Sequence, residues 1–262
     1  MTEIAIEHEQ PVLRTELRGN ILVITLNRPH AKHAFNNALA VALSETLDRY
    51  DDDSTASVAV LTGAGGTFSS GMDLKALLTG ERSYTDKRGG FGIMKRPPDK
   101  PLIAAVEGYA VAGGFELALS TDLIVAARDA KFGLPEVKRG LVAIGGALFR
   151  LPRRIPYHAV MEMALTGELY SAERLQQLGL VSRVVTPGGA LEAALELAAT
   201  IAQNGPLALR ATKQILFQSH AWTDEQGWTE QRRFADPALR SEDAKEGPRA
   251  FAEKRKPSWR GI

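Results

Sequence analysis

The chain has 262 residues, of which 44% are hydrophobic and 24% are charged, a composition typical of a folded globular protein. Its 32 basic and 31 acidic residues nearly cancel, which argues against a surface built to attract nucleic acid or an anionic membrane. The sequence contains no cysteine, which excludes a disulfide framework, a cysteine-based metal site and a cysteine nucleophile. We expect one large hydrophobic core.

The N-terminal sequence MTEIAIEHEQP carries three glutamates and lacks an apolar stretch of signal-peptide length. No later segment approaches the roughly 18 uncharged apolar residues that a membrane span requires. From the sequence we therefore expect a cytoplasmic protein that is not attached to a membrane.

The first third of the chain predicts a hairpin followed by a helix. Residues 12–17 and 21–26 are short β-rich runs, and Arg18-Gly19-Asn20 between them is typical of a turn. Residues 37–50 carry apolar side chains at helical spacing.

Three short apolar runs further along are typical of strands buried on both faces; they span residues 58–61, 102–106 and 123–127. Because strands and helices alternate in this part of the chain, we expect an α/β fold with a parallel or mixed sheet. Residues 80–100 differ, since they combine clustered charges, glycines and Pro97-Pro98. We expect a mobile loop there, of the kind that often lies beside an active site.

Strand signals stop after about Pro187, and four helical segments follow, at residues 190–203, 207–219, 224–233 and 242–254. We therefore divide the chain into an α/β core, residues 1–186, and a C-terminal helical region, residues 187–262.

Three glycine-rich segments are the candidates for chemistry: residues 63–75 (GAGGTFSSGMDLK), 108–119 (GYAVAGGFELAL) and 132–141 (FGLPEVKRGL). In the first two, a strand leads through a glycine turn into a helix start, which leaves backbone N–H groups unpaired. Two such donors aimed at one point form an oxyanion hole, and the candidates are the N–H groups of Met72 and Gly113. The alternative is an ordinary pair of tight turns. Neither segment matches a dinucleotide fingerprint or a phosphate-binding loop.

Glu116 and Glu136 are the acid–base candidates. Glu116 has apolar neighbours, so its carboxylate must be paired, hydrogen-bonded or functional; the alternative is a carboxylate that stabilises a helix N-terminus. Glu136 follows Pro135 and precedes Lys138, so a surface ion pair is its alternative role. The five histidines have no metal-ligand spacing and are interpreted as structural or exposed.

Together these segments resemble the crotonase, or enoyl-CoA hydratase/isomerase, superfamily over nearly the whole chain. The resemblance includes the three glycine-rich segments, the twenty-residue separation of Glu116 and Glu136, and two further motifs, LNRPHAKHAFN at 26–36 and ELYSAERLQQLGLVSRVV at 168–185. It implies a spiral of ββα units with a C-terminal helical region that forms trimers or dimers of trimers.

The resemblance also implies an activity and its residues. The enzyme would be an enoyl-CoA hydratase, a lyase that adds water reversibly to a 2-enoyl-CoA. The N–H groups of Met72 and Gly113 would bind the thioester oxygen, and Glu116 and Glu136 would activate the water and supply the α-proton. CoA would be the carrier of the substrate, contacted by Ala31, Lys75, Phe251 and Lys254, with no other cofactor and no metal.

Two departures concern the acyl-chain preference. Ala143 and Ile144 stand where many hydratases have Pro-Gly, and Phe115 stands where many have Cys. Within the superfamily, the segment GGFELAL and the C-terminal sequence are similar to carnitinyl-CoA dehydratases. Dehydration of that kind, enoyl-CoA isomerisation, and a CoA-ester- or RNA-binding relative with little activity are the alternatives.

Overall fold

The computed structural model describes residues 10–262, so His8 and most of the N-terminal sequence that argues against a signal peptide lie outside the described residues. Its centre is a six-stranded sheet in the order β1-β2-β3-β6-β8-β11. β1 and β2 form an antiparallel hairpin, and all the other neighbours are parallel. The strands are β1 (Leu13–Arg18), β2 (Ile21–Leu26), β3 (Val58–Gly63), β6 (Leu102–Val106), β8 (Leu123–Ala127) and β11 (Arg183–Val185). The predicted hairpin and the three predicted buried strands are confirmed.

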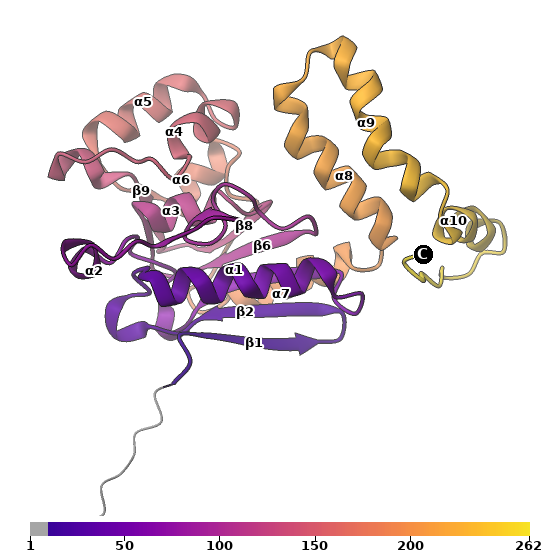
Figure 1. Cartoon of the computed structure of the whole chain (residues 1–262), viewed down its shortest axis with the longest axis horizontal. Coiled ribbons are helices and arrows are strands. Elements are labelled where there is room, and N and C mark those ends of the chain that lie inside the picture. Colours follow the sequence, from indigo (N-terminus) through magenta and orange to yellow (C-terminus); the bar gives the residue numbers. More distant parts are fainter. Residues whose placement is uncertain (1–9) are drawn as a thin grey trace, which may run out of the picture.

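Both faces of this sheet are covered, which explains why its central strands are apolar throughout. On β3, Ala59 and Leu61 point into the larger core cluster, whereas Val58 and Val60 point into the smaller one. Helix α1 (Asn37–Asp52) packs on the first face and α7 (Ala190–Ile201) on the second (Figure 1).

The packing of α7 moves the boundary that the sequence predicts at residue 187. Ala190, Ala194 and Ala198 are fully buried against the sheet. Helix α7 therefore belongs to the core, because small side chains at this spacing let a helix lie close to a sheet, and the projecting helical region begins after it.

A second, three-stranded sheet positions the glycine-rich segments. It has the order β10-β9-β7, with β7 (Tyr109–Val111) parallel to β9 (Lys131–Gly133) and β10 (Tyr170–Ser171) antiparallel to β9. The chain therefore runs from a strand of the large sheet, through a strand of the small sheet, into a helix. This happens at β6-β7-α3 (Gly113–Ala118), and β8-β9 leads in the same way into the short helix η3 (Pro135–Arg139).

The expected mobile loop at residues 80–100 is wrong for much of its length. It contains the short hairpin β4 (Tyr84–Thr85) and β5 (Gly89–Gly90) and buries Phe91 and Ile93. Arg88, 1% exposed, anchors it with ion pairs to Asp48 and Asp51 of α1, each 2.7 Å long. One charge of this cluster is therefore buried in an ion-pair network that holds the segment on α1.

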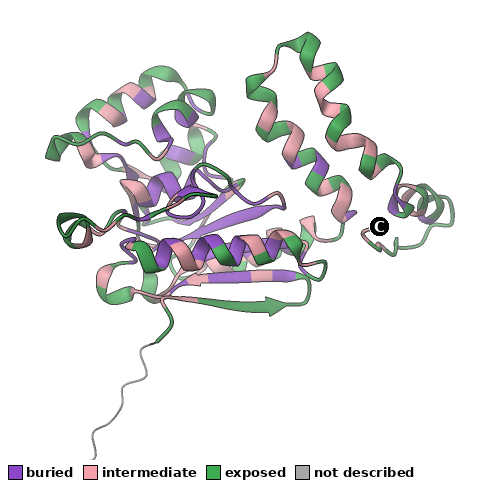
Figure 2. Ribbon diagram, viewed as in Figure 1, coloured by how far each residue is buried: buried purple, intermediate pink, exposed green. Residues whose placement is uncertain are grey.

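Three further helices, α8 (Pro206–Gln218), α9 (Asp224–Leu239) and α10 (Glu242–Ala252), form an arm that projects from the core (Figure 1). Figure 2 shows few buried residues along α8 and α9. Helix α9 begins at a capping box between Thr223 and Gln226 and extends past the predicted end at residue 233. Its only proline, Pro237, lies in its last turn.

The remaining α-helices are α2 (Leu74–Leu78), α4 (Ala147–Arg150), α5 (Tyr157–Thr166) and α6 (Ala172–Gln177). Among residues 10–262, none of the helices combines the length and the apolar character that crossing a bilayer would need.

Candidate active site

The three glycine-rich segments, far apart in the sequence, lie side by side. The N–H of Ser69 donates to Tyr109 O (2.8 Å), and the N–H of Val111 donates back to Ser69 O (3.1 Å). On the other side, the N–H of Ala112 donates to Gly133 O (2.9 Å). Main-chain ladders thus bring the two predicted donor segments and the segment that precedes Glu136 to one place.

The two predicted oxyanion donors are brought together. Gly71, at φ +96°, lies so close to the second segment that a Cβ on it would be 3.0 Å from Gly113 N. Residues flanking Met72 are paired, because Gly71 O accepts from Phe35 N and Asp73 N donates to Phe35 O. The N–H groups of Met72 and Gly113 themselves have no hydrogen-bond acceptor among residues 10–262.

The backbone around Gly113 is specialised. Ala112, directly before it, has φ 51° and ψ −131°, a conformation that costs a non-glycine residue about 1–3 kcal/mol. A side chain at Gly113 would meet the ring of Phe91 at 2.6 Å. Phe91 in turn stacks on Phe35 at a centroid distance of 4.2 Å. Only glycine fits beneath this aromatic cover.

Glu116 lies in the first turn of α3 and is 4% exposed. Its Oε1 accepts a hydrogen bond from the N–H of Ala147 (3.1 Å). A Cβ on Gly145 would lie 2.5 Å from Glu116 Oε2, so the loop before α4 closely covers the carboxylate. The charged form therefore has backbone donors despite its burial.

Glu136 lies in η3 and is half-buried. Its Oε2 is buried and has no hydrogen-bond partner among residues 10–262. The surface ion pair considered for it is absent in that range, because Lys138 pairs with Glu168 at 2.7 Å instead. Glu136 thus presents a free carboxyl oxygen.

Burial raises the pKa of both carboxyl groups. The pKa of Glu116 is raised to about 7, chiefly by burial and in part by repulsion from Glu136, against the lowering effect of the Ala147 and Gly145 N–H groups. Burial also raises the pKa of Glu136, which Arg139 partly offsets. Because Glu136 contributes to the pKa of Glu116, the two groups are close enough to interact, as an acid–base pair requires.

The four predicted CoA contacts fall into two places. Ser70 N donates to Lys32 O (3.0 Å), which puts Ala31, in the short helix η1 (Pro29–Ala31), beside the first donor segment. Lys75 lies exposed in α2, on the same segment. Phe251 lies in the last turn of α10 and Lys254 just after this helix, which is on the opposite side of the molecule from α2 (Figure 1).

His33 illustrates the structural role predicted for the histidines. It is fully buried, and its Nδ1 accepts from the N–H of Arg28 (3.0 Å). Its Nε2 therefore donates to Ala64 O (2.7 Å), which links the 26–36 motif to the first glycine-rich segment.

Sequence reasoning missed Arg150, Gly145 and Ala147. Arg150 lies within a basic stretch with Arg153 and Arg154, so no sequence signal marks it as buried.

The two residues that replace the Pro-Gly of many hydratases differ in exposure. Ala143 is buried, whereas Ile144 is 86% exposed.

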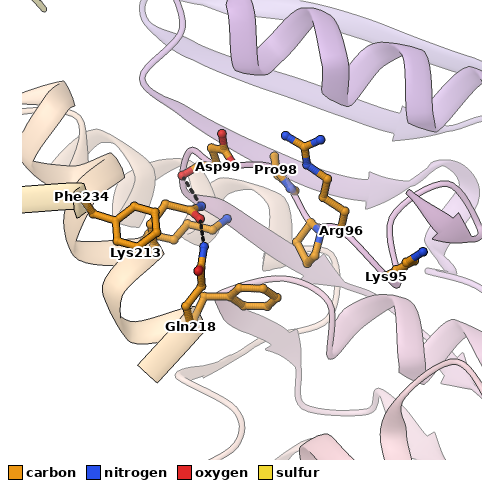
Figure 3. A pocket seen from close by; sticks show the side chains of 10 residues that line it. Lys95, Arg96, Pro98, Asp99, Lys213, Gln218 and Phe234 are labelled. Carbon is orange, nitrogen blue, oxygen red and sulfur yellow. Dashed lines mark hydrogen bonds between the residues drawn. The ribbon is translucent and has the colours of Figure 1, made fainter. Parts of the chain in front are cut away.

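A cavity of about 360 Å³ lies elsewhere, between the end of the 80–100 segment and the arm. Figure 3 shows Lys95, Arg96, Asp99, Lys213 and Phe234 around it. None of the predicted catalytic or donor residues lines it.

Comparison with known proteins agrees with this geometry. Residues 16–261 match the Enoyl-CoA hydratase/isomerase family. The chain is 40% identical to an enoyl-CoA hydratase of Mycobacterium tuberculosis over 95% of its length and 96% of that protein. It is 44% identical to a carnitinyl-CoA dehydratase of Salmonella arizonae, over 95% and 98%.

A crystal structure of an enoyl-CoA hydratase from M. tuberculosis superposes with a TM-score of 0.94 at 55% identity, covering 97% of this chain and all of that one. The chain belongs to the enoyl-CoA hydratase/isomerase family, and the expected crotonase-like fold is confirmed.

Proposed function

We propose that this chain is an enoyl-CoA hydratase that adds water across the double bond of a 2-enoyl-CoA thioester. The observation that carries the proposal is the meeting of two interacting carboxyl groups, both of raised pKa, with two free N–H donors on adjoining segments. The likeness to proteins named enoyl-CoA hydratase supports it.

In the proposed mechanism, the N–H groups of Met72 and Gly113 bind the thioester oxygen. Water adds to the β-carbon, its proton passes to a carboxylate, and the electrons of the double bond move onto the thioester oxygen as an enolate. The two donors stabilise this charge, which is larger in the transition state than in the substrate. The α-carbon then takes a proton from the second carboxyl group.

The surroundings of the two carboxyl groups support separate roles. Glu116 receives the Ala147 N–H, a contact that favours its ionised form, so we assign it to activate the water. The Oε2 of Glu136 is buried without a hydrogen-bond partner among residues 10–262, which favours the protonated form of this group, so we assign it to supply the α-proton. Such delivery by two neighbouring groups produces syn addition. The chemistry uses groups of this chain alone, with CoA as the carrier.

Carnitinyl-CoA dehydration is the second candidate, because the chain is 44% identical to a carnitinyl-CoA dehydratase, an identity between those to the two enoyl-CoA hydratases, 40% and 55%. The same two carboxyl groups would run the reaction in reverse, with loss of water from a β-hydroxyacyl thioester.

We also propose that the active unit is a trimer or a dimer of trimers. The arm exposes large apolar side chains: Leu216, Trp228, Leu239 and Phe251 are each at least 65% exposed. Helix α10 lies on the opposite side of the molecule from α2, which carries Lys75. Phe251 and Lys254 would therefore contact CoA that is bound to a neighbouring subunit.

The test follows the loss of enoyl-thioester absorbance with crotonyl-CoA, for wild type and for the Glu116→Gln and Glu136→Gln variants. We expect fast hydration by wild type and a fall of about 10²-fold or more in each variant. Activity that survives both substitutions contradicts the residue roles. A wild type inactive on crotonyl-CoA but active on a γ-trimethylammonio enoyl-CoA supports the second candidate.

A further inference from the structure

Arg150, the last residue of α4, is a buried cation whose hydrogen bonds all go to uncharged oxygen atoms. It is 8% exposed. Its Nη1 donates to Ser120 Oγ (3.1 Å) and Gly145 O (3.3 Å), and its Nη2 donates to the carbonyl oxygen of Met94. Among residues 10–262 it has no ion pair, and burying a guanidinium without one is costly.

These three acceptors belong to the three segments that enclose the Glu116 carboxylate. Ser120 Oγ donates to Glu116 O (2.8 Å), which attaches Arg150 to the end of α3. Gly145 lies against the carboxylate, and a Cβ built on it would be 2.5 Å from both Glu116 Oε2 and Met94 Sδ. Arg150 thus ties together the helix that carries Glu116, the loop that hydrogen-bonds it and the segment that covers it.

We propose that Arg150 is a positioning residue that holds the Gly145–Ala147 loop on the Glu116 carboxylate and keeps this carboxylate ionised for water activation. The proposal rests on the proposed hydration, because it assigns Arg150 to the group that takes the proton from water.

Electrostatics point the same way. The charged groups that face Glu116 are Glu136 of η3, which raises its pKa, and Arg150 of α4, which lowers it. Burial lowers the pKa of Arg150 to about 10, so it stays protonated at neutral pH. Loss of Arg150 would remove its charge and release the backbone donors, and both changes raise the pKa of Glu116 further.

The experiment compares wild type with Arg150→Gln and Arg150→Lys in the full-length enzyme. We expect the acidic limb of the kcat/KM profile to move to higher pH by about one unit in Arg150→Gln, since a nearby charge of this kind is worth about 1–3 pKa units. Arg150→Lys keeps the charge but not the forked geometry, so a smaller displacement is expected. KM should change little.

Lys213→Gln is the matched control. Lys213 is also 8% exposed and also buried as a cation, but it binds Lys100 O (2.7 Å) and Asp122 (2.7 Å) and does not contact the Glu116 loop. Its substitution should lower the unfolding temperature without moving the acidic limb. An Arg150→Gln enzyme that loses activity equally at every pH, or a Lys213→Gln enzyme with the same displacement, would overturn the proposal.

A second measurement separates this proposal from the hydration itself. Infrared titration of the protonated carboxyl band, assigned to Glu116 by its loss in Glu116→Gln, reports the pKa without turnover. If wild type fails to hydrate any enoyl-CoA but the band still titrates at higher pH in Arg150→Gln, the function fails and the electrostatic role stands. An unmoved band refutes the role, whatever the activity.

Discussion

Gly145 leaves room for the Glu116 carboxylate because it has no side chain. An alanine Cβ there would lie 2.5 Å from Glu116 Oε2 and from Met94 Sδ, both of which are ends of side chains that can move. We therefore expect Gly145→Ala to destabilise the fold by only about 1 kcal/mol, because overpacking relieved by flexible groups is cheap. Hydration should fall about 10²-fold, since the carboxylate must leave its position.

Steady-state kinetics and urea unfolding of Gly145→Ala would measure the two effects. Gly227→Ala is the control, because a Cβ there meets nothing within 4 Å. Unchanged activity in Gly145→Ala would show that the position of Glu116 is not critical.

The raised pKa of Glu116 also has a consequence for stability. Between about pH 4.5 and pH 7 the native state binds this proton more tightly than the unfolded state, so the free energy of unfolding falls as pH rises through this window. Glu116→Gln lacks this titration. Relative to wild type it should therefore gain roughly 1–3 kcal/mol between pH 4.5 and pH 8.

Urea unfolding of both proteins at these two pH values would measure the gain, with Glu45→Gln, at an exposed position of α1, as the control. A difference between wild type and Glu116→Gln that is equal at both pH values would contradict the raised pKa.

At the scale of elements, the 80–100 segment depends on one side chain. Arg88 pairs with Asp48 and Asp51 and also donates to Arg96 O (3.0 Å). Removing one partner of a buried ion pair costs about 3–5 kcal/mol, because the remaining charge is left uncompensated. Here that charge is Asp51, since Asp48 keeps its pair with Lys87 at 2.7 Å. We expect Arg88→Gln to lose up to this much in urea unfolding and to open the segment to trypsin cleavage after Lys95.

Arg82→Gln provides the comparison, since Arg82 is exposed on the same segment. It should unfold like wild type. Equal stability of the Arg88 and Arg82 variants would restore the interpretation of the segment as a loosely held loop.

At the scale of the whole molecule, the arm exposes large apolar side chains that a single chain does not cover. Trp228 and Leu239 of α9 are 76% and 65% exposed. Burying such side chains contributes about 1.5–3 kcal/mol each, so a partner that covers them is strongly favoured. Light scattering of wild type should give three or six times the 28.4 kDa of one chain.

Changing Trp228 and Leu239 together to serine should lower this mass toward that of a monomer. Leu165→Ser, at a 67% exposed position of α5 outside the arm, should leave the mass unchanged. A wild-type mass of 28.4 kDa would remove the basis for placing Phe251 and Lys254 in a neighbour's site.

The sequence by itself determined the hairpin, three buried strands of the large sheet and most of the helices, and it singled out the two glutamates as candidates. Local patterns carry this information, because a strand buried on both faces must be apolar throughout and a donor turn must contain glycine. The spacing of Glu116 and Glu136 with their flanking motifs was enough to place the chain in its family.

Only the tertiary structure decided which neighbours those residues have. Burial of Arg88 and Arg150, the contact of Gly145 with Glu116 and the packing of α7 on the sheet all join residues distant in the sequence or hidden among like residues. A charged residue has the same letter whether water or protein surrounds it. Its energetic role is set by the segments that the fold brings around it, and these cannot be read from its sequence neighbours.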